Sequence, residues 1–241
     1  MAGERRQRIL DRLLGAGSAG LETKHLCEVC AEVTEVAGAG IMLMSGDVPR
    51  GSLCTTNTVS AQIEDLQFGL GEGPCVDAYQ QDRPVSESDL GDPATPRWLG
   101  FTAPALAAGV RAVFGFPLHA GAARLGALNL YRDRPGPLTD EQHADALVMS
   151  DVAAQAVLIM QAQAPPGELA KALEAGADFQ FVFHQASGMV AAQLDVSIAE
   201  AMIRLRAHAF GNGRPLGEVA ADVVARALRF DRSTGERDPR R

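Results

Sequence analysis

The segment VRAVFGFPLHAGAARLGALNLY, residues 110–131, decides the fold class of this chain. It contains two runs with the composition of β-strands, residues 110–117 and 124–131, joined by the short segment His119–Ala122. Two such runs around a short connection that contains glycine indicate a β-hairpin. The segment therefore predicts two antiparallel strands in the middle of the chain.

A second hairpin is expected nearer the N-terminus. Residues 40–44 (GIMLM) and 51–56 (GSLCTT) flank a turn at Ser45–Asp47, and Pro84–Ser86 forms a further short strand. Helical patterns are expected at residues 4–14, 21–37, 58–68, 76–82, 101–108 and 140–162. Helices that alternate with hairpins favour an antiparallel sheet flanked by helices, which is an α+β domain.

The C-terminal part, residues 179–230, has three short helical patterns in succession. The first ends at Asp195-Val196, and Ser197 followed three residues later by Glu200 has the spacing of a capping box at the start of the second. Gly211–Gly213 ends the second helix, because these residues accept a left-handed backbone. A bundle of about 50 residues is only marginally stable alone, so we expect it to depend on a partner.

The chain is expected to divide into five segments. These are an N-terminal helix and linker (1–20), a sheet domain (21–163), a linker or helical connection (164–178), a three-helix bundle (179–230) and a disordered tail (231–241). Pro165-Pro166-Gly167 breaks the long helix at its end and is expected to act as the joint between the two domains.

The charge of the chain is unevenly distributed. Residues 1–163 hold 12 Lys and Arg against 20 Asp and Glu, whereas residues 164–241 hold ten of each. Within the second part, residues 204–241 carry nine Arg and five acidic residues. This mild basicity alone neither establishes nor excludes a nucleic-acid partner.

The four cysteines are Cys27, Cys30, Cys54 and Cys75. Cys27 and Cys30 form a CxxC within a helical pattern, but no second CxxC or histidine pair accompanies it, so buried thiols are favoured over a zinc or redox site. Cys75, beside Gly73-Pro74, is a candidate redox sensor. The N-terminal sequence resembles no secretory signal and no apolar run is long enough for a membrane span, so we expect a reducing cytoplasm.

Residues 26–160 resemble a GAF domain, a sensor domain of bacterial regulators. The resemblance lies in the two hairpins, in LGEGPC at Leu70–Cys75, in the strand at Pro84-Val85 and in GALNLY at Gly126–Tyr131. It implies a sensor domain that can enclose a small molecule between the sheet and the covering helices. The identity of this small molecule is left open, and no cofactor is identified. Candidate pocket residues are Met42, Cys54, Cys75, Phe114, Phe116 and Tyr131, for each of which ordinary core packing is the alternative.

Residues 179–230 resemble an ANTAR domain, the three-helix RNA-binding module of transcription antiterminators. The matching residues are Gln185–Val190, Glu200-Ala201, Leu205–Ala209, Gly213–Leu216 and Val219-Ala220. The resemblance implies a homodimer, formed through helices that flank the sensor, which binds paired hexaloop stem-loops in nascent mRNA. A terminator then fails to form.

Candidate RNA contacts follow from the matching segments. Arg offers a planar fork of donors for phosphates and base edges. A glycine in the middle of a helix invites an explanation, because it destabilises the helix by about 1 kcal/mol relative to alanine. At Gly188 that explanation is either close approach by RNA or close helix packing, and Ser187 is expected to lie partly outward beside it. The candidate residues are Gln185, Ser187, Gly188, Arg204, Arg206 and Arg214.

An enzyme is not expected, since GxxxxGK[ST], HExxH and GxSxG are all missing from the sequence, and no metal site is predicted. Two alternatives remain for the bundle. It could bind DNA as a helix-turn-helix, although its third helix carries Glu218 and Asp222 where a recognition helix needs donors. It could also serve mainly for protein docking or dimerisation.

Overall fold

The computed structural model describes residues 2–14, 23–45, 48–92, 97–163, 178–214 and 216–231. The chain divides into two compact units, Met1–Leu173 and Glu174–Arg241. The expected joint at Pro165-Pro166-Gly167 and the expected tail beyond Asp231 lie outside the described residues.

The first unit is built on an antiparallel sheet. Its strands are β1 (Gly38–Ser45), β2 (Val48–Thr55), β3 (Val85–Glu87), β4 (Ala112–Ala120) and β5 (Ala123–Arg132). Their spatial order is β2-β1-β5-β4-β3, and all neighbours pair antiparallel. Both predicted hairpins are therefore confirmed, and the hairpin of residues 110–131 lies at the centre of the sheet.

The connection between β4 and β5 is tighter than the sequence indicated. His119 pairs with Arg124 and Ala120 with Ala123, so His119 and Ala120 belong to β4 rather than to a four-residue loop. The turn consists of Gly121 and Ala122, and Gly121 has a φ of 61°. Two-residue hairpin turns need positive φ values, which glycine adopts without strain.

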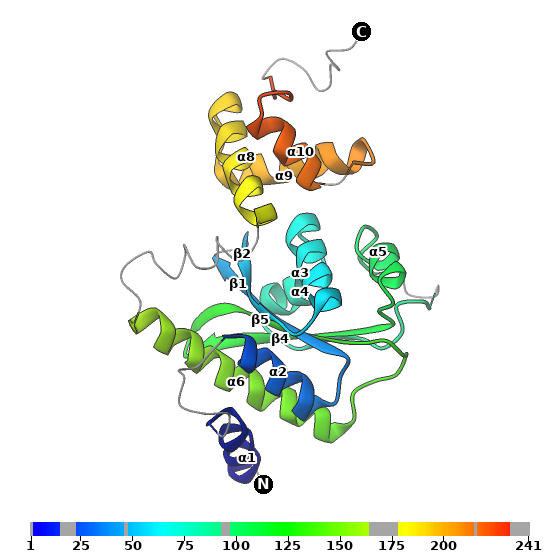
Figure 1. Cartoon of the computed structure of the whole chain (residues 1–241), viewed down its shortest axis with the longest axis vertical. Helices are drawn as coiled ribbons and strands as arrows, with labels where there is room; N and C mark the ends of the chain where they lie inside the picture. Colours follow the sequence, from blue (N-terminus) through cyan, green and yellow to red (C-terminus); the bar gives the residue numbers. More distant parts are fainter. Residues whose placement is uncertain are drawn as a thin grey trace. The chain divides into compact units, whose positions relative to one another are not determined.

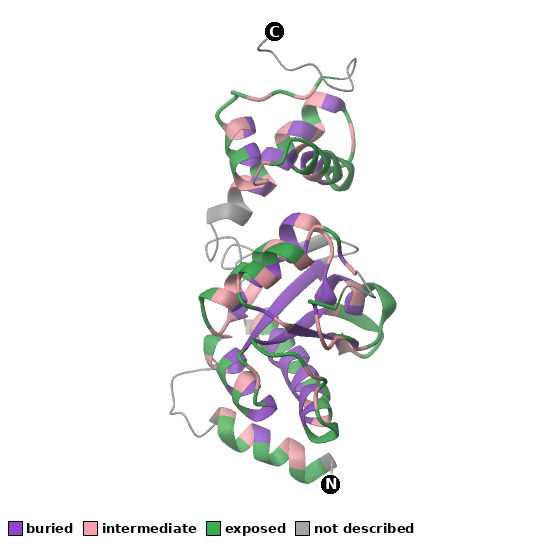
Figure 2. Cartoon of the chain, turned by 90° about the vertical axis from the view of Figure 1, so that its right-hand side faces the viewer, coloured by how far each residue is buried: buried purple, intermediate pink, exposed green. Residues whose placement is uncertain are grey.

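Helices cover both faces of the sheet (Figure 1). The helices α2 (Thr23–Thr34) and α6 (Asp140–Gln163) lie on one face. The opposite face carries α3 (Thr58–Leu70), α4 (Pro74–Gln81) and α5 (Thr102–Ala107). The strands between these layers are mostly buried (Figure 2).

Alternation along the strands separates two hydrophobic cores. Leu128 and Leu130 of β5 belong to the core beneath α2 and α6, whereas Ala127 and Tyr131 belong to the core beneath α3, α4 and α5. Successive side chains of a strand point to opposite faces of the sheet, so the position of each residue in the strand decides which core it joins.

In the described part of the chain, α6 is the one helix long and apolar enough by length and composition to cross a membrane. Half of its apolar window is buried within the fold, and Met149, Ala153 and Val157 are part of the core on the sheet. The helix therefore has the apolar character of a core helix.

The expected N-terminal helix is confirmed as α1 (Ala2–Leu14). Its Ile9 is fully buried in the core beneath α2 and α6. Arg5 donates to Asp145 at 2.6 Å and to Glu141 at 2.6 Å, and Arg8 also reaches Asp145 at 2.6 Å. These contacts attach α1 to α6.

The second unit contains the three predicted helices, α8 (Asp178–Leu194), α9 (Ile198–Gly211) and α10 (Leu216–Val224). The predicted cap of α9 forms, because the Ser197 side chain accepts a hydrogen bond from the Glu200 amide at 3.1 Å. The third helix ends at Val224, before the expected end of the bundle at residue 230.

Candidate functional site

A row of residues across the three central strands forms the floor of the candidate site. Asn129 of β5 pairs with Gly40 of β1 on one side and with Gly115 of β4 on the other. Ala127 and Tyr131, two residues before and after Asn129, face α3, α4 and α5, so Asn129 faces the same helices. The Asn129 side chain therefore lies between two glycines.

The helix above this row presents polar residues to the sheet. Ser60, Glu64 and Gln67 are spaced by four and three residues, which places them on one face of α3, and all three are buried. The start of this helix is fixed by a capping box, in which Asn57 accepts from the Ser60 amide and the Ser60 hydroxyl accepts from the Asn57 amide. The helix therefore turns a polar face toward the floor.

The two glycines allow the helices to approach the sheet closely. A Cβ at residue 40 would lie 2.6 Å from Glu64 Oε1, and a Cβ at residue 115 would lie 2.2 Å from the carbonyl oxygen of Pro74, at the start of α4. Real Cβ atoms do not make such contacts. A larger residue at position 115 would force α4 away from the sheet, and one at position 40 would displace the Glu64 side chain or α3.

Several buried atoms of this site have no hydrogen-bond partner. Glu64, Gln67 and Asn129 are at most 1% exposed, and we refer to them as the Glu64 cluster. Both Glu64 carboxyl oxygens, Gln67 Nε2 and Asn129 Oδ1 make no hydrogen bond of good geometry, although Asn129 lies close enough to Glu64, and Gln67 to Cys75, to lower the pKa of each acid. Most buried polar atoms in native proteins have a partner, and an unpartnered one costs about 1–3 kcal/mol. These atoms form a polar cluster within the otherwise apolar core beneath α3, α4 and α5.

Burial governs the protonation of the site. It raises the pKa of Glu64 to about 8, an effect that the nearby Asn129 side chain partly offsets and the Asp65 charge slightly increases. Burial also raises the pKa of the Cys75 thiol well above its ordinary value, and the proximity of Glu64 adds to the increase. Because the thiolate is the reactive form, the closed site does not support the hypothesis that Cys75 is a redox sensor.

A loop that contains the one tryptophan of the chain lies in the same core. Trp98 belongs to the cluster of buried residues that includes Cys75 and Tyr131. Its indole Nε1 donates to Asp77 of α4 at 3.1 Å. Glu72 accepts hydrogen bonds from the Gly100 and Phe101 amides at 2.6 and 2.9 Å. The loop is thus attached to the segment that carries Cys75.

The six pocket residues predicted from the sequence do not share one face of the sheet. Cys54, Phe114 and Phe116 lie in the core beneath α2 and α6, whereas Cys75 and Tyr131 lie in the core beneath α3, α4 and α5. Met42 alternates with Ile41 and Leu43, which belong to the first core, so it faces the second. Only Met42, Cys75 and Tyr131 therefore share a face with the Glu64 cluster.

The prediction of free thiols is wrong for two cysteines. Cys27 of α2 and Cys54 of β2 form a disulfide, while Cys30 and Cys75 are free and buried. Buried thiols were predicted for the CxxC, but α2 packs beside β2 and brings Cys54 to Cys27. In the described residues, no group of His, Cys, Asp or Glu side chains could hold a metal ion.

The residues that the Glu64 cluster contains were missed by the sequence analysis. The signals were the polar spacing of Ser60, Glu64 and Gln67 within a helix that must cover a sheet, and Asn129 inside the apolar strand GALNLY. Neither signal alone shows that these polar residues are buried, because that depends on how α3 and the sheet pack together.

In the second unit, the predicted RNA-contact residues fall into two groups. Gln185 and Gly188 are exposed on α8, and Arg204 is exposed on α9. Ser187, expected to lie partly outward, is fully buried and donates to the carbonyl of Phe183 at 2.7 Å. A buried serine satisfies its hydroxyl in this way by bonding back one helical turn, so Ser187 is not a surface contact.

The three arginines are held by groups of the same unit. Arg204 pairs with Glu200 at 2.6 Å, and Arg214 pairs with Asp222 at 2.7 Å. The Arg206 guanidinium lies 5.5 Å from the ring centre of Phe183, and burial lowers the pKa of Arg206 to about 10. Arg206 therefore packs as part of the bundle rather than extending into solvent.

The two explanations offered for Gly188 can be separated. A Cβ built on Gly188 would meet no atom within 4 Å, so no helix of the unit packs closely against it. Among the described residues, helix packing within this unit therefore does not explain the glycine.

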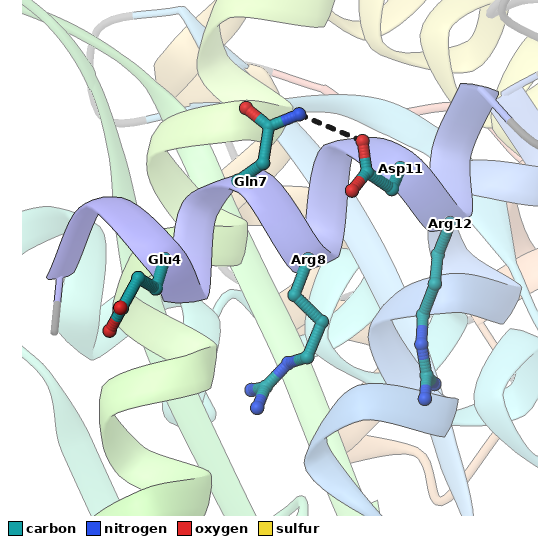
Figure 3. Close-up of a pocket in the computed structure, with 5 residues that line it drawn as sticks. All are labelled: Glu4, Gln7, Arg8, Asp11 and Arg12. Carbon is teal, nitrogen blue, oxygen red and sulfur yellow. Dashed lines mark hydrogen bonds between the residues drawn. The ribbon is translucent and has the colours of Figure 1, made fainter.

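A shallow hollow on α1 is lined by Glu4, Gln7, Arg8, Asp11 and Arg12 (Figure 3). All of these residues come from one helix, and Gln7 donates to Asp11 at 2.8 Å within it. The hollow follows the polar face of α1 and gathers no residues from other elements. We therefore assign no ligand site to it.

Comparison with known proteins identifies the first unit. Residues 23–159 match the family model described as GAF domain. The GAF domain of a phosphoenolpyruvate-protein phosphotransferase from Coxiella burnetii superposes with a TM-score of 0.51 at 15% identity, over 67% of this chain and 95% of that one. The corresponding GAF domain from Acinetobacter gives 0.48 at 13% identity, over 67% and 96%. A search of curated proteins returned no match.

The likeness to the Coxiella burnetii domain, at 15% identity, shows the fold alone. The family match covers more than half of the chain, including both hairpins and the Glu64 cluster. The chain therefore belongs to the GAF domain family.

Proposed function

We propose that this protein is an RNA-binding transcription antitermination regulator controlled by its GAF domain. In this proposal the GAF domain binds a small-molecule effector, and the three-helix unit is an ANTAR domain that binds paired hexaloop stem-loops in nascent mRNA. The protein acts in the cytoplasm as a homodimer and catalyses no reaction. Reduction of the Cys27–Cys54 disulfide in that compartment would leave all four cysteines free.

The observation that carries the proposal is the open surface at Gly188. The ANTAR-like segments fold into three helices of a separate compact unit, and α8 keeps a glycine where nothing in the unit packs. Gly188 and the exposed Gln185 lie three residues apart and hence on one face of α8. A face with a polar side chain and no bulk beside it suits an RNA loop, which is recognised by shape and by its unstacked bases.

The electrostatics of the unit predict modest affinity for a single copy. Arg204 and Arg214 are already paired with Glu200 and Asp222, so RNA phosphates must compete with these carboxylates. Neutralised arginines release fewer counterions and add less to affinity. Two copies bound to two linked stem-loops overcome this weakness, because the second contact is intramolecular.

The GAF unit offers a surface for the dimer. Leu147, Leu158 and Ile159 of α6 are between 41 and 49% exposed. In this proposal they contribute to a contiguous apolar patch, which is the kind of surface that marks an interface, and α1 is attached to the same helix through Arg5 and Asp145. Pairing through α1 and α6 would join two GAF domains and supply two RNA-binding units to one assembly.

One observation favours the alternative that the bundle docks a protein or dimerises. Ile203 and Phe210 of α9 are 62 and 72% exposed, and their spacing of seven residues places them on one face of the helix. An apolar face of this kind suits another protein surface. Under this alternative, RNA would not be recognised.

The experiment that separates the two is a gel shift with the full chain. The nucleic acids are an RNA with two linked hexaloop stem-loops, the same RNA with one stem-loop, and a DNA duplex of equal charge. The proposal expects the tandem RNA to bind most tightly, the single stem-loop more weakly and the duplex weakest. Equal binding to all three, or no binding to any, would contradict it.

A further inference from the structure

The disulfide between Cys27 and Cys54 connects the helices on one face of the sheet to the chain segment that leads to the other face. Cys27 lies in α2, and Cys54 lies near the end of β2. Three residues after Cys54, Asn57 caps α3, which covers the opposite face (Figure 1). The bond therefore restrains the end of β2 and the start of α3 relative to α2.

Both ends of this restraint have other attachments that do not need the bond. β2 pairs with β1 along its length. Asn57 accepts a hydrogen bond from the Tyr131 hydroxyl at 2.8 Å and donates to the Ala37 carbonyl at 3.1 Å. α2 packs in the core through Leu26 and Val29. Reduction would thus remove a local restraint from a chain that stays folded, so the bond can break and form again.

The two cysteines of the bond differ in burial. Cys54 is 8% exposed and lies on β2, at the edge of the sheet, whereas Cys27 is fully buried. Thiol–disulfide exchange requires that the incoming thiolate reach one of the two sulfur atoms. Cys54 therefore carries the sulfur that a small thiol attacks, and Cys27 is the leaving group.

The neighbouring free thiol cannot replace either partner in this exchange. Cys30 lies three residues after Cys27 on α2, and both belong to the same core. Burial raises the pKa of the Cys30 thiol far above its ordinary value. Because the thiolate is the reactive form, Cys30 stays inert, and exchange is confined to Cys27 and Cys54 in spite of the CxxC spacing.

We propose that Cys27 and Cys54 form a reversible redox site that exchanges with small thiols and their disulfides. The inference rests on the cytoplasmic location in the proposed function, because disulfides in that compartment are usually transient and catalytic or redox-sensing. The oxidised chain holds β2 against α2, and the reduced chain releases it. The site gives the GAF unit an input that does not depend on a bound effector.

The exchange balances with glutathione as the reductant and glutathione disulfide as the oxidant. A glutathione thiolate attacks the Cys54 sulfur, the bond to Cys27 breaks, and Cys27 leaves as a thiolate that takes up the proton lost by glutathione. A second glutathione thiolate attacks the glutathione sulfur of the mixed disulfide, and Cys54 leaves and is protonated in turn. One protein disulfide and two glutathione molecules become two protein thiols and one glutathione disulfide. The reverse sequence oxidises the chain.

A redox titration of the full chain tests the exchange. The protein is equilibrated in buffers with increasing ratios of reduced to oxidised glutathione, free thiols are trapped by alkylation, and the peptides that contain Cys27 and Cys54 are quantified by mass spectrometry. We expect the disulfide to fall from nearly complete to nearly absent as the ratio rises, and to return when the ratio is reversed. The matched controls Cys30→Ala and Cys75→Ala should give the same curve.

Hydrogen exchange measures the structural response to reduction. Amides of β2 should exchange about tenfold or more faster in the reduced chain, and this increase should exceed that in β5, because the lost restraint is local. Cys27→Ala should exchange as the reduced chain does in both buffers. Thermal unfolding of the reduced chain and of the variant shows whether each remains folded.

Four outcomes overturn the inference. The disulfide could stay complete in every buffer with an excess of reduced glutathione, which would make it a permanent structural bond. Reduction could unfold the GAF unit, or it could leave the exchange of β2 unchanged. A bond between Cys27 and Cys30 in any buffer would contradict the assigned pair. RNA gel shifts in both buffers keep the two proposals apart, since absence of RNA binding in both would refute antitermination and leave the titration standing.

Discussion

The carboxyl group of Glu64 occupies the space that a side chain at Gly40 would need. A Cβ at residue 40 would lie 2.6 Å from Glu64 Oε1. Gly40 is also the residue of β1 that faces Asn129 across the sheet. The position of a buried acid over the centre of the sheet thus depends on a glycine 24 positions earlier in the chain.

This relationship predicts that Gly40→Ala is destabilising. The added methyl group must displace the Glu64 side chain or α3, and such overpacking typically costs about 1–3 kcal/mol. Urea unfolding of the two proteins measures the difference. A second substitution, Glu64→Ala, removes the obstructing group, so it should cost less in the Gly40→Ala background than in the unaltered chain. Equal costs in the two backgrounds would show that the two residues do not compete for space.

The raised pKa of Glu64 predicts an unusual dependence of stability on pH. The carboxyl has a pKa of about 8 in the folded chain and an ordinary value of 4.5, so the folded state holds the proton more tightly. The contribution of Glu64 to the free energy of unfolding is fully present below pH 4.5. It is lost as the pH rises through about 8, at up to about 1.4 kcal/mol per pH unit.

This prediction is checked by measuring the free energy of unfolding at several pH values between 5 and 8, for the unaltered chain and for Glu64→Gln. The titratable groups coupled to Glu64 are Asp65 of α3, whose charge raises the pKa of Glu64, and Cys75 of α4, whose own pKa Glu64 raises. Both remain in the variant, so the difference between the two curves isolates Glu64. Parallel curves for the two proteins would mean that Glu64 titrates normally.

The disulfide between Cys27 and Cys54 predicts a stability that depends on redox conditions. The bond closes a loop with a sequence separation of 27 residues, and cross-links of this length stabilise a fold by roughly 3–4 kcal/mol in the chain-entropy account. Reductant should therefore lower the free energy of unfolding by about this amount, and should have no such effect on Cys27→Ala. Thiol titration of the unreduced, denatured chain should find two free thiols, those of Cys30 and Cys75. Four free thiols would contradict the pairing.

The open space at Gly188 predicts opposite effects on stability and on RNA binding. Gly188→Ala meets no atom within 4 Å, so it should stabilise α8 by about 0.5–1 kcal/mol through the lower backbone entropy of alanine. It should also weaken RNA binding, because the methyl group stands where RNA approaches. Gly188→Gln should weaken it further, whereas Ala221→Gln, at an exposed site of α10, should not. Unchanged affinity in both glycine variants would place the RNA surface elsewhere.

Much of the fold could be predicted from local patterns. The hairpin of residues 110–131, the cap at Ser197 and the order of helices and strands all follow from features within a few neighbouring residues. What could not be predicted depends on which distant residues meet. The disulfide joins α2 to β2, and the six predicted pocket residues were divided between two cores by strand alternation.

The candidate site shows the same limit more clearly. In the sequence, Asn129 is a polar exception in an apolar strand, and Glu64 resembles a surface residue of a helix. The close packing of Glu64 over Asn129 depends on Gly40 and Gly115. These glycines become their neighbours only when β1, β5 and β4 are placed side by side. In the second unit, Ser187 was placed outward because the sequence does not reveal which turn of α8 faces the bundle.

The most direct test of the central claim is to crosslink the protein to RNA in cells and to sequence what is recovered, with the Gly188→Gln variant as the matched control. The account predicts that the unaltered chain recovers transcripts enriched in two neighbouring hexaloop stem-loops that precede or overlap a terminator, and that the variant loses this enrichment. Recovery of RNA without such paired stem-loops, or equal recovery by the variant, would contradict the proposal that this GAF protein regulates transcription through RNA.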